Sequence, residues 1–199
     1  MSHSEFNAML DLLAMLFMDW RTGILLLLLT GAAISDYRSR RIPNRLVLSG
    51  ILFGVIYNTA LPPSPHANIL FPLAGIGMGL LLFLPLYLLR AMSAGDVKLL
   101  AMVGAFLGPG NTFYAALATM IVGGVLSILL VLARGTARQM FHNLAAIFQP
   151  GFLDAAGGFA PGRRITAGTS AGTLPYAVAI ALGTIGYLVL HQLGFLLIE

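Results

Sequence analysis

The sequence predicts an all-α membrane protein, a polytopic bundle of about six transmembrane helices. Of its 199 residues, 58% are hydrophobic and only 9% are charged, whereas about a quarter of the residues in a typical soluble domain are charged. The chain contains several long apolar segments, and most basic residues lie in every second connection between these segments. Each of the few charges must therefore lie where a bilayer tolerates it or where it serves the function.

The apolar segments are delimited by their length and by the turn-forming residues between them. There are six, at residues 20–35, 46–61, 69–92, 97–107, 112–133 and 176–197. A transmembrane helix takes roughly 20 residues, about 17 at the short end, so the third, fifth and sixth segments are long enough. The first and second are marginal, and Pro72 and Pro85 interrupt the third. The fourth is short, which predicts a tilted span or a locally thinned bilayer.

The distribution of basic residues predicts the topology. If all six segments cross and the N-terminus is outside, ten of the eleven Lys and Arg residues lie on the cytoplasmic side, and only Arg21 is outside. This asymmetry follows the positive-inside rule and favours six spans over a re-entrant fourth segment. We expect a single domain over residues 1–199, with 1–19 a non-cytoplasmic lead-in and 134–174 a cytoplasmic loop. Two points stay open: residues 7–18 as part of a span, and an amphipathic surface helix over 137–148.

Composition also excludes several kinds of site. The chain has no cysteine, which excludes disulfides, Cys-ligated zinc, iron–sulfur clusters and thiol catalysis. The four histidines are scattered and form no H-x-x-x-H pair, so we expect no metal and no cofactor. The net charge of +4 is explained by membrane orientation rather than by nucleic-acid binding, so the lipid bilayer is the expected partner.

Two aspartates lie at the edges of apolar segments. Asp36 lies in "AAISDYRSRRIPN" and Asp96 in "SAGDVKLLAMVGAF". The predicted topology places both at the cytoplasmic level, where helix packing would bring their carboxyl groups together. Two adjacent carboxylates in a poorly hydrated site tend to share one proton. That is the state in which an aspartic protease activates water with one carboxylate and polarises the scissile carbonyl with the other.

Other interpretations of these aspartates remain open. Asp36 could end a helix at the headgroups beside Arg38, and Asp96 could be an ordinary N-cap. A small transporter or proton channel would use such groups as relay sites, and a scaffold protein would use them as caps. The string "GTSAG" at 168–172 formally matches a nucleophile elbow, but it lacks the strand–turn–helix context and is interpreted as a flexible linker.

The strings "SDYRSRRIPN" and "AGDVKLLAMVGAFLGP" together resemble the type IV prepilin peptidases, which are intramembrane aspartic proteases of the GxGD class. "LPYAVAIALGT", at 174–184, is similar to the final helix of that family. The resemblance covers about residues 22–190 and implies that Asp36 and Asp96 are the catalytic pair. It implies cleavage of a short basic leader from a prepilin or pseudopilin precursor with a single hydrophobic helix. Cleavage would occur at the cytoplasmic face of a prokaryotic inner membrane.

The resemblance also suggests which residues support the site. Gly95 is the glycine directly before the motif aspartate, and Pro43 and Asn44 match the "RIPN" string. We expect Pro43 to start the second helix and Asn44 to hydrogen bond near the loop, while Lys98 either tunes the pair or faces lipid phosphates. The chain departs from G-x-G-D at one position, where Ser93 replaces the first glycine.

Size distinguishes this chain within the family it resembles. Larger members also methylate the new N-terminus and carry an insert with paired C-x-x-C motifs. This chain has neither cysteine nor room for that insert. It resembles the compact peptidases of tight-adherence (Flp-type) pili, and the archaeal preflagellin peptidases are similar in organisation. The resemblance therefore implies peptidase activity without methyl transfer.

Overall fold

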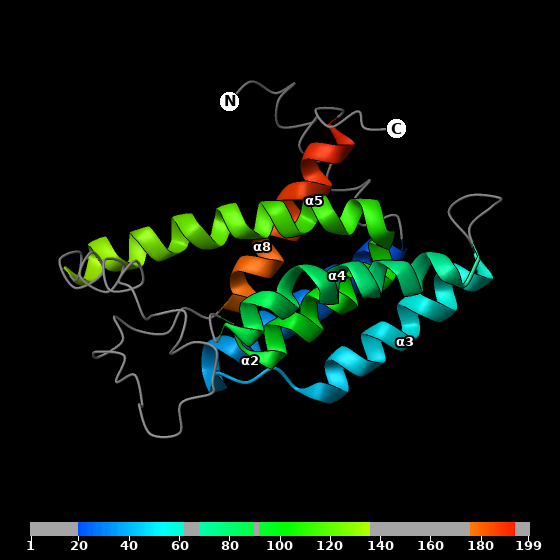
Figure 1. Cartoon of the computed structure of the whole chain (residues 1–199), viewed down its shortest axis with the longest axis horizontal. Coiled ribbons are helices and arrows are strands. Elements are labelled where there is room, and N and C mark those ends of the chain that lie inside the picture. Colours follow the sequence, from blue (N-terminus) through cyan, green and yellow to red (C-terminus); the bar gives the residue numbers. More distant parts are fainter. Residues whose placement is uncertain (1–19, 62–67, 90–91, 136–175, 194–199) are drawn as a thin grey trace. The chain divides into compact units, whose positions relative to one another are not determined.

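A computed structural model describes residues 20–61, 68–89, 92–135 and 176–193 (Figure 1). These ranges contain helices and no strand, so the predicted all-α class is confirmed for them. The helices are α2 (Trp20–Ser39), α3 (Asn44–Ala60), α4 (Leu70–Leu88), α5 (Ala94–Arg134) and α8 (Tyr176–Gln192). The predicted lead-in at 1–19, the helix over 137–148 and the string at 168–172 lie outside the described residues.

The helices follow the expected segments, with one difference at the prolines of the third segment. Helix α4 contains Pro72 in its first turn, where a proline displaces no hydrogen bond, and it also continues through Pro85. The fourth and fifth expected segments are two helical stretches that meet at a kink at Gly108, and together they carry the label α5. Among the described helices, α4 and α5 are long and apolar enough to cross a membrane. The six-span arrangement stays a prediction.

The break in α5 lies inside the string "GPGN" at 108–111, directly after the fourth expected segment. Gly108 has φ 76° and ψ 176°, a conformation that glycine adopts without steric cost. Pro109 has no N–H to donate, so the carbonyl of Ala105 loses its helical partner. The buried Asn58 of α3 replaces it, because its Nδ2 donates to Ala105 O at 2.6 Å and to Phe106 O at 3.2 Å. A side chain of a neighbouring helix thus satisfies the broken backbone, as an apolar environment requires.

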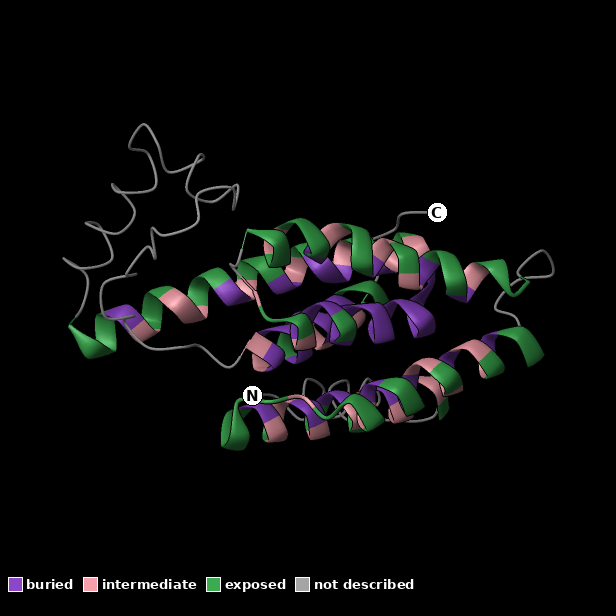
Figure 2. Cartoon of the chain, turned by 60° about the horizontal axis from the view of Figure 1, so that its bottom comes forward, coloured by how far each residue is buried: buried purple, intermediate pink, exposed green. Residues whose placement is uncertain are grey.

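The first half of α5 is the central helix of the core. From Val97 to Leu107 every residue except Lys98 is buried (Figure 2). Helix α3 approaches it through Gly50 and Gly54, where an added Cβ would crowd Met102 and Ala105 respectively. Neither glycine was singled out in the sequence as a packing residue. Small residues at this spacing let helix backbones approach closely.

Helix α4 packs against the same central helix through a second glycine pair. A Cβ on Gly75 would overlap the carbonyl oxygen of Gly104, and a Cβ on Gly104 would overlap that of Gly75. One turn further along α4, a Cβ on Gly79 would lie 2.7 Å from Leu100 O. At this crossing the two backbones touch with no side chain between them, as close packing through glycine allows.

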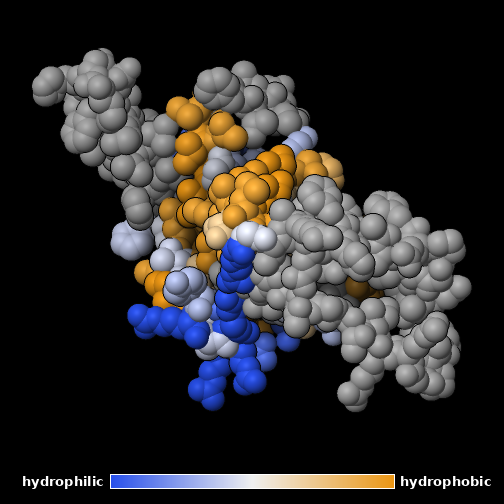
Figure 3. All heavy atoms as spheres, turned by 90° about the vertical axis from the view of Figure 1, so that its left-hand side faces the viewer, coloured by the Kyte–Doolittle hydropathy of each residue, from blue (hydrophilic) through white to orange (hydrophobic). Residues whose placement is uncertain are grey.

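The outward surface of the described helices is strongly apolar. Large side chains such as Leu27, Leu81 and Ile121 are exposed, and hydrophilic residues gather at one edge of the face in Figure 3. Exposed arginines accompany the end of α2 and the start of α3, at Arg38, Arg40, Arg41 and Arg45. Extended apolar surface of this kind marks contact with lipid or a partner protein, which is consistent with an integral membrane protein.

The chain divides into two compact units, Met1–Gly123 with Pro175–Glu199, and Gly124–Leu174. All the residues of the candidate site described below belong to the first unit. The single-domain organisation stays an expectation.

Candidate active site

Asp36 lies in the buried stripe of α2. The buried residues of this helix are Leu25, Leu29, Ala32 and Asp36, a helical spacing in which the last position is ionisable instead of apolar. Asp36 is only 8% exposed, and its Oδ2 accepts a hydrogen bond of 3.1 Å from the backbone N–H of Ala177. Ala177 lies in the first turn of α8, where backbone N–H groups have no partner within the helix. Asp36 thus joins the end of α2 to the start of α8, at the positive end of the α8 dipole.

The loop after Asp36 is held by serine hydroxyl groups. Ser35 Oγ and Ser39 Oγ both donate to the carbonyl of Arg41, at 2.9 Å and 3.3 Å. Arg40 has φ 53°, a left-handed conformation that commonly ends a helix. Pro43 is the residue directly before the first helical residue of α3. The string "SDYRSRRIPN" therefore forms a tight connection between α2 and α3.

Asp96 is the third helical residue of α5 and is only 5% exposed. Its backbone N–H donates to Ser93 Oγ at 3.3 Å, and its Oδ2 accepts from the backbone N–H of Ser93 at 3.0 Å. These reciprocal bonds form a capping box, in which Ser93 is the N-cap and Asp96 the third residue. The Ser93 hydroxyl also donates to the same Oδ2 at 2.7 Å. Asp96 is therefore fixed at the start of the central helix, and Ser93 rather than Asp96 is the cap.

The expected supporting residues connect the two motif strings. A Cβ on Gly95 would lie 3.3 Å from Ile42 Cδ1, so Gly95 packs against the loop between α2 and α3. Lys98 is exposed, and its Nζ donates to Asn44 Oδ1 at 3.3 Å, which links α5 to the first residue of α3. Lys98 thus has a partner on α3.

The two carboxyl groups come from positions 60 residues apart, and they lie close enough to interact electrostatically. The charge of Asp96 also acts on the phenol group of Tyr176, the first residue of α8. Each aspartate uses Oδ2 in the hydrogen bonds above, and neither Oδ1 accepts one from the described residues. This arrangement leaves one oxygen of each carboxyl group available to a water molecule or a substrate.

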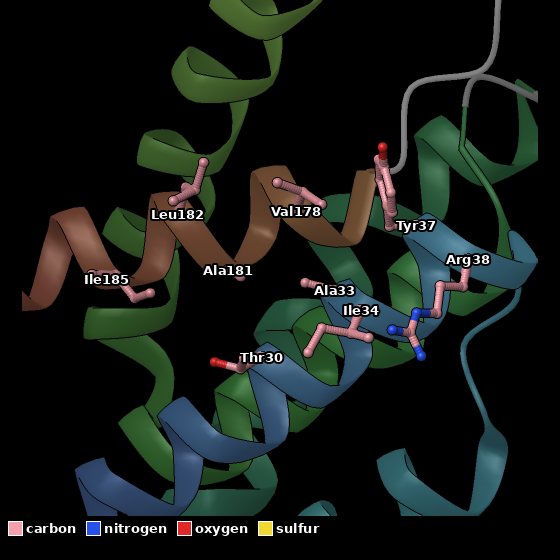
Figure 4. A pocket seen from close by; sticks show the side chains of 9 residues that line it. All are labelled: Thr30, Ala33, Ile34, Tyr37, Arg38, Val178, Ala181, Leu182 and Ile185. Carbon is pink, nitrogen blue, oxygen red and sulfur yellow. The ribbon is translucent and has the colours of Figure 1, made fainter.

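An apolar groove of about 510 Å³ runs between α2 and α8. Figure 4 shows Thr30, Ala33 and Ile34 of α2 on one side and residues of α8 on the other, with Tyr37 and Arg38 near the first turn of α8. The α8 side is formed by Val178, Ala181, Leu182 and Ile185. Asp36 does not line the groove, but it directly precedes the lining residue Tyr37, and its carboxyl group accepts from Ala177, which directly precedes the lining residue Val178.

Sequence reasoning missed three residues of this site. Tyr176 and Ala177 complete the surroundings of the aspartates, and the only signal for them was the likeness of the segment 174–184 to a family helix. Ser93 was noted as a departure from the motif but not as a partner of Asp96. Among the described residues, no group of three or more His, Cys, Asp or Glu side chains is placed to hold a metal ion.

Comparison with known proteins bears on what such a site does. No curated protein and no solved structure matches this chain. The model of the type IV leader peptidase family matches residues 23–128, more than half of the chain. The matched range contains both aspartates, Ser93 and the loop between α2 and α3. The chain therefore belongs to the type IV leader peptidase family.

Proposed function

We propose that this protein is an intramembrane aspartic endopeptidase that removes the short basic leader from prepilin or pseudopilin precursors. Asp36 and Asp96 form its catalytic pair at the cytoplasmic face of a prokaryotic inner membrane. The chain crosses that membrane six times with its N-terminus outside. Its compact form, without a methyltransferase insert, serves pili of the tight-adherence (Flp) type.

One observation carries the proposal. Two ionisable side chains from distant segments are both buried and within electrostatic reach of each other, in a chain of the leader peptidase family. Burying a carboxylate costs free energy unless hydrogen bonds compensate it. Asp36 has one such bond and Asp96 has two, and no donor among the described residues binds the other oxygen of either group.

The chemistry follows from a shared proton. The ionised carboxylate takes a proton from a water molecule, whose oxygen attacks the carbonyl carbon of the scissile peptide bond. The protonated carboxyl group donates its proton to the carbonyl oxygen and polarises that bond. Collapse of the tetrahedral intermediate breaks the C–N bond, and the departing nitrogen receives a proton from the pair. The products are the leader with a new carboxylate and the mature chain with a new amino group.

Reconstitution tests the proposed function directly. The purified protein in liposomes, mixed with pilin-type precursors from the same genome and a metal chelator, is expected to cut one precursor once. Mass spectrometry would then show loss of the basic leader and the new N-terminus. Proton flux across liposomes without cleavage of any precursor would contradict the proposal and favour the transporter.

The groove between α2 and α8 provides a place for the hydrophobic helix of the substrate. Its walls are mainly apolar, and Ala33 and Ala181 are small enough for another helix to approach closely. Asp36 directly precedes Tyr37, which lines one end of the groove. A helix lying along the groove would place the peptide bond before its apolar segment beside the aspartates.

Cysteine cross-linking tests this placement, because the natural chain has no cysteine. Val178→Cys and Ile185→Cys, two turns apart on α8, are expected to cross-link to single-cysteine precursors. The preferred precursor position should differ by about seven residues between them, since a helix rises about 1.5 Å per residue. Leu52→Cys, on the exposed face of α3, is the matched control. Equal cross-linking at Leu52→Cys would exclude the placement. So would groove variants that still cut the precursor but react only with a thiol-reactive phospholipid in the bilayer, since lipid would then occupy the groove.

A further inference from the structure

The Ser93 hydroxyl takes part in two hydrogen bonds with Asp96. It accepts from the Asp96 N–H at 3.3 Å and donates to Asp96 Oδ2 at 2.7 Å. One orientation of the hydroxyl satisfies both bonds, because a hydroxyl group donates once and accepts at its lone pairs. The Ser93 backbone N–H donates to the same Oδ2 at 3.0 Å. Oδ2 is therefore held by two donors from a single residue.

Ser93 replaces the first glycine of the G-x-G-D motif, so this chain has a hydroxyl group where the motif has no side chain. A glycine at 93 would keep the backbone N–H bond to Oδ2 and would lose both hydroxyl bonds. Gly95, two residues later, lies beside the hydroxyl: a Cβ at that position would make an ordinary contact of 3.4 Å with Ser93 Oγ and a tighter one of 3.3 Å with Ile42 Cδ1. The serine and the following glycine together form a compact turn around the Asp96 carboxyl group.

We propose that Ser93 is a positioning residue of this peptidase, whose hydroxyl fixes the Asp96 side chain so that its free Oδ1 serves the reaction. The inference rests on the proposed catalytic pair. A carboxyl group held at one oxygen by two bonds has its rotamer fixed, and the orientation of its other oxygen is fixed with it. Misplacement of a reacting group by about 1 Å costs on the order of 100-fold in rate. Since the backbone bond remains when the hydroxyl is removed, we expect a loss of about tenfold.

Three substitutions separate positioning from simple capping. Ser93→Gly removes the hydroxyl and keeps a residue that is tolerated at an N-cap. It is expected to lower kcat about tenfold, in line with the loss of one charge-assisted bond, with KM and the unfolding temperature unchanged. Ser93→Ala should lower kcat similarly and also lower the unfolding temperature, because alanine is a poor N-cap. Ser93→Thr, which keeps the hydroxyl, should restore kcat.

Wild-type kcat in Ser93→Gly would overturn the proposal, as would a fall in kcat that follows the loss of thermal stability across the three variants. A second measurement does not depend on cleavage. Carbodiimide labelling of the reconstituted protein, read by mass spectrometry, is expected to rise several-fold at Asp96 in Ser93→Gly and to stay constant at Asp36. Unchanged labelling at Asp96 would contradict the positioning role even if no precursor were cut. Absence of cleavage by the wild-type protein would instead count against the proposed function.

Discussion

Asp96→Asn and Asp36→Asn are each expected to lower the cleavage rate about 1,000-fold, in the range that general acid–base catalysis contributes. An amide neither takes a proton from water nor donates one in the way a carboxyl group does. It does keep the structural bonds, because the amide oxygen still accepts from Ser93 at position 96 and from the Ala177 N–H at position 36. The rate of leader release by the reconstituted variants measures the effect, and the unfolding temperature of each variant shows that the helices remain assembled.

Asp154→Asn supplies the same chemical change outside the described residues and is the control for the substitution itself. The capping box gives Asp96 a structural role of its own, so the folding measurement is essential for this residue. Full processing of the precursor by either Asp36→Asn or Asp96→Asn, with the variant still folded, would exclude the two-aspartate mechanism. Loss of activity together with loss of folding would assign Asp96 to capping alone.

Gly75→Ala is expected to destabilise the protein by at least about 2 kcal/mol, within the usual cost of overpacking. The new Cβ would overlap the carbonyl oxygen of Gly104 and approach the Gly104 carbonyl carbon to 2.8 Å. These neighbours are backbone atoms of the central helix and have no rotamer with which to move away. Helix α4 must then move away from α5, which weakens the packing next to it. Unfolding in mixed detergent micelles, followed by circular dichroism, measures the change.

Gly77→Ala is the matched control on the same helix. A Cβ at position 77 would meet no atom within 4 Å, and alanine favours a helix over glycine by about 1 kcal/mol. We therefore expect equal or slightly greater stability for this variant. Equal destabilisation by the two alanines would mean that helix propensity or lipid contact, and not the crossing of α4 and α5, decides the effect.

The sequence predicted the helical class and the paired aspartates because these features are local. Asp36 and Asp96 stand at the edges of apolar segments, and their strings are recognisable without a structure. The Gly75 and Gly79 contact was also predictable, because glycines four residues apart lie on one face of a helix. Gly50 and Gly54 have the same spacing, but nothing in the sequence names the central helix that they contact.

Other features depend on partners that are distant in sequence. The kink at Gly108 follows from the local "GPGN" string, but the donor that satisfies it does not, because Asn58 lies on another helix. In the sequence, Ser93 is only a departure from the G-x-G-D motif. The structure shows that its hydroxyl group donates to Asp96 Oδ2. The hydrogen bond between Asp36 and Ala177 joins residues 141 positions apart, and no local sequence pattern predicts it.

That link also has a consequence for how the protein is made. Ribosomes synthesise the chain from its N-terminus, so Asp36 enters the growing polypeptide 141 residues before Ala177. The hydrogen bond that holds this carboxylate in its buried position cannot form until nearly all of the 199 residues have been translated. Both aspartates are thus translated well before Ala177, and their common setting is completed by the last described helix to leave the ribosome.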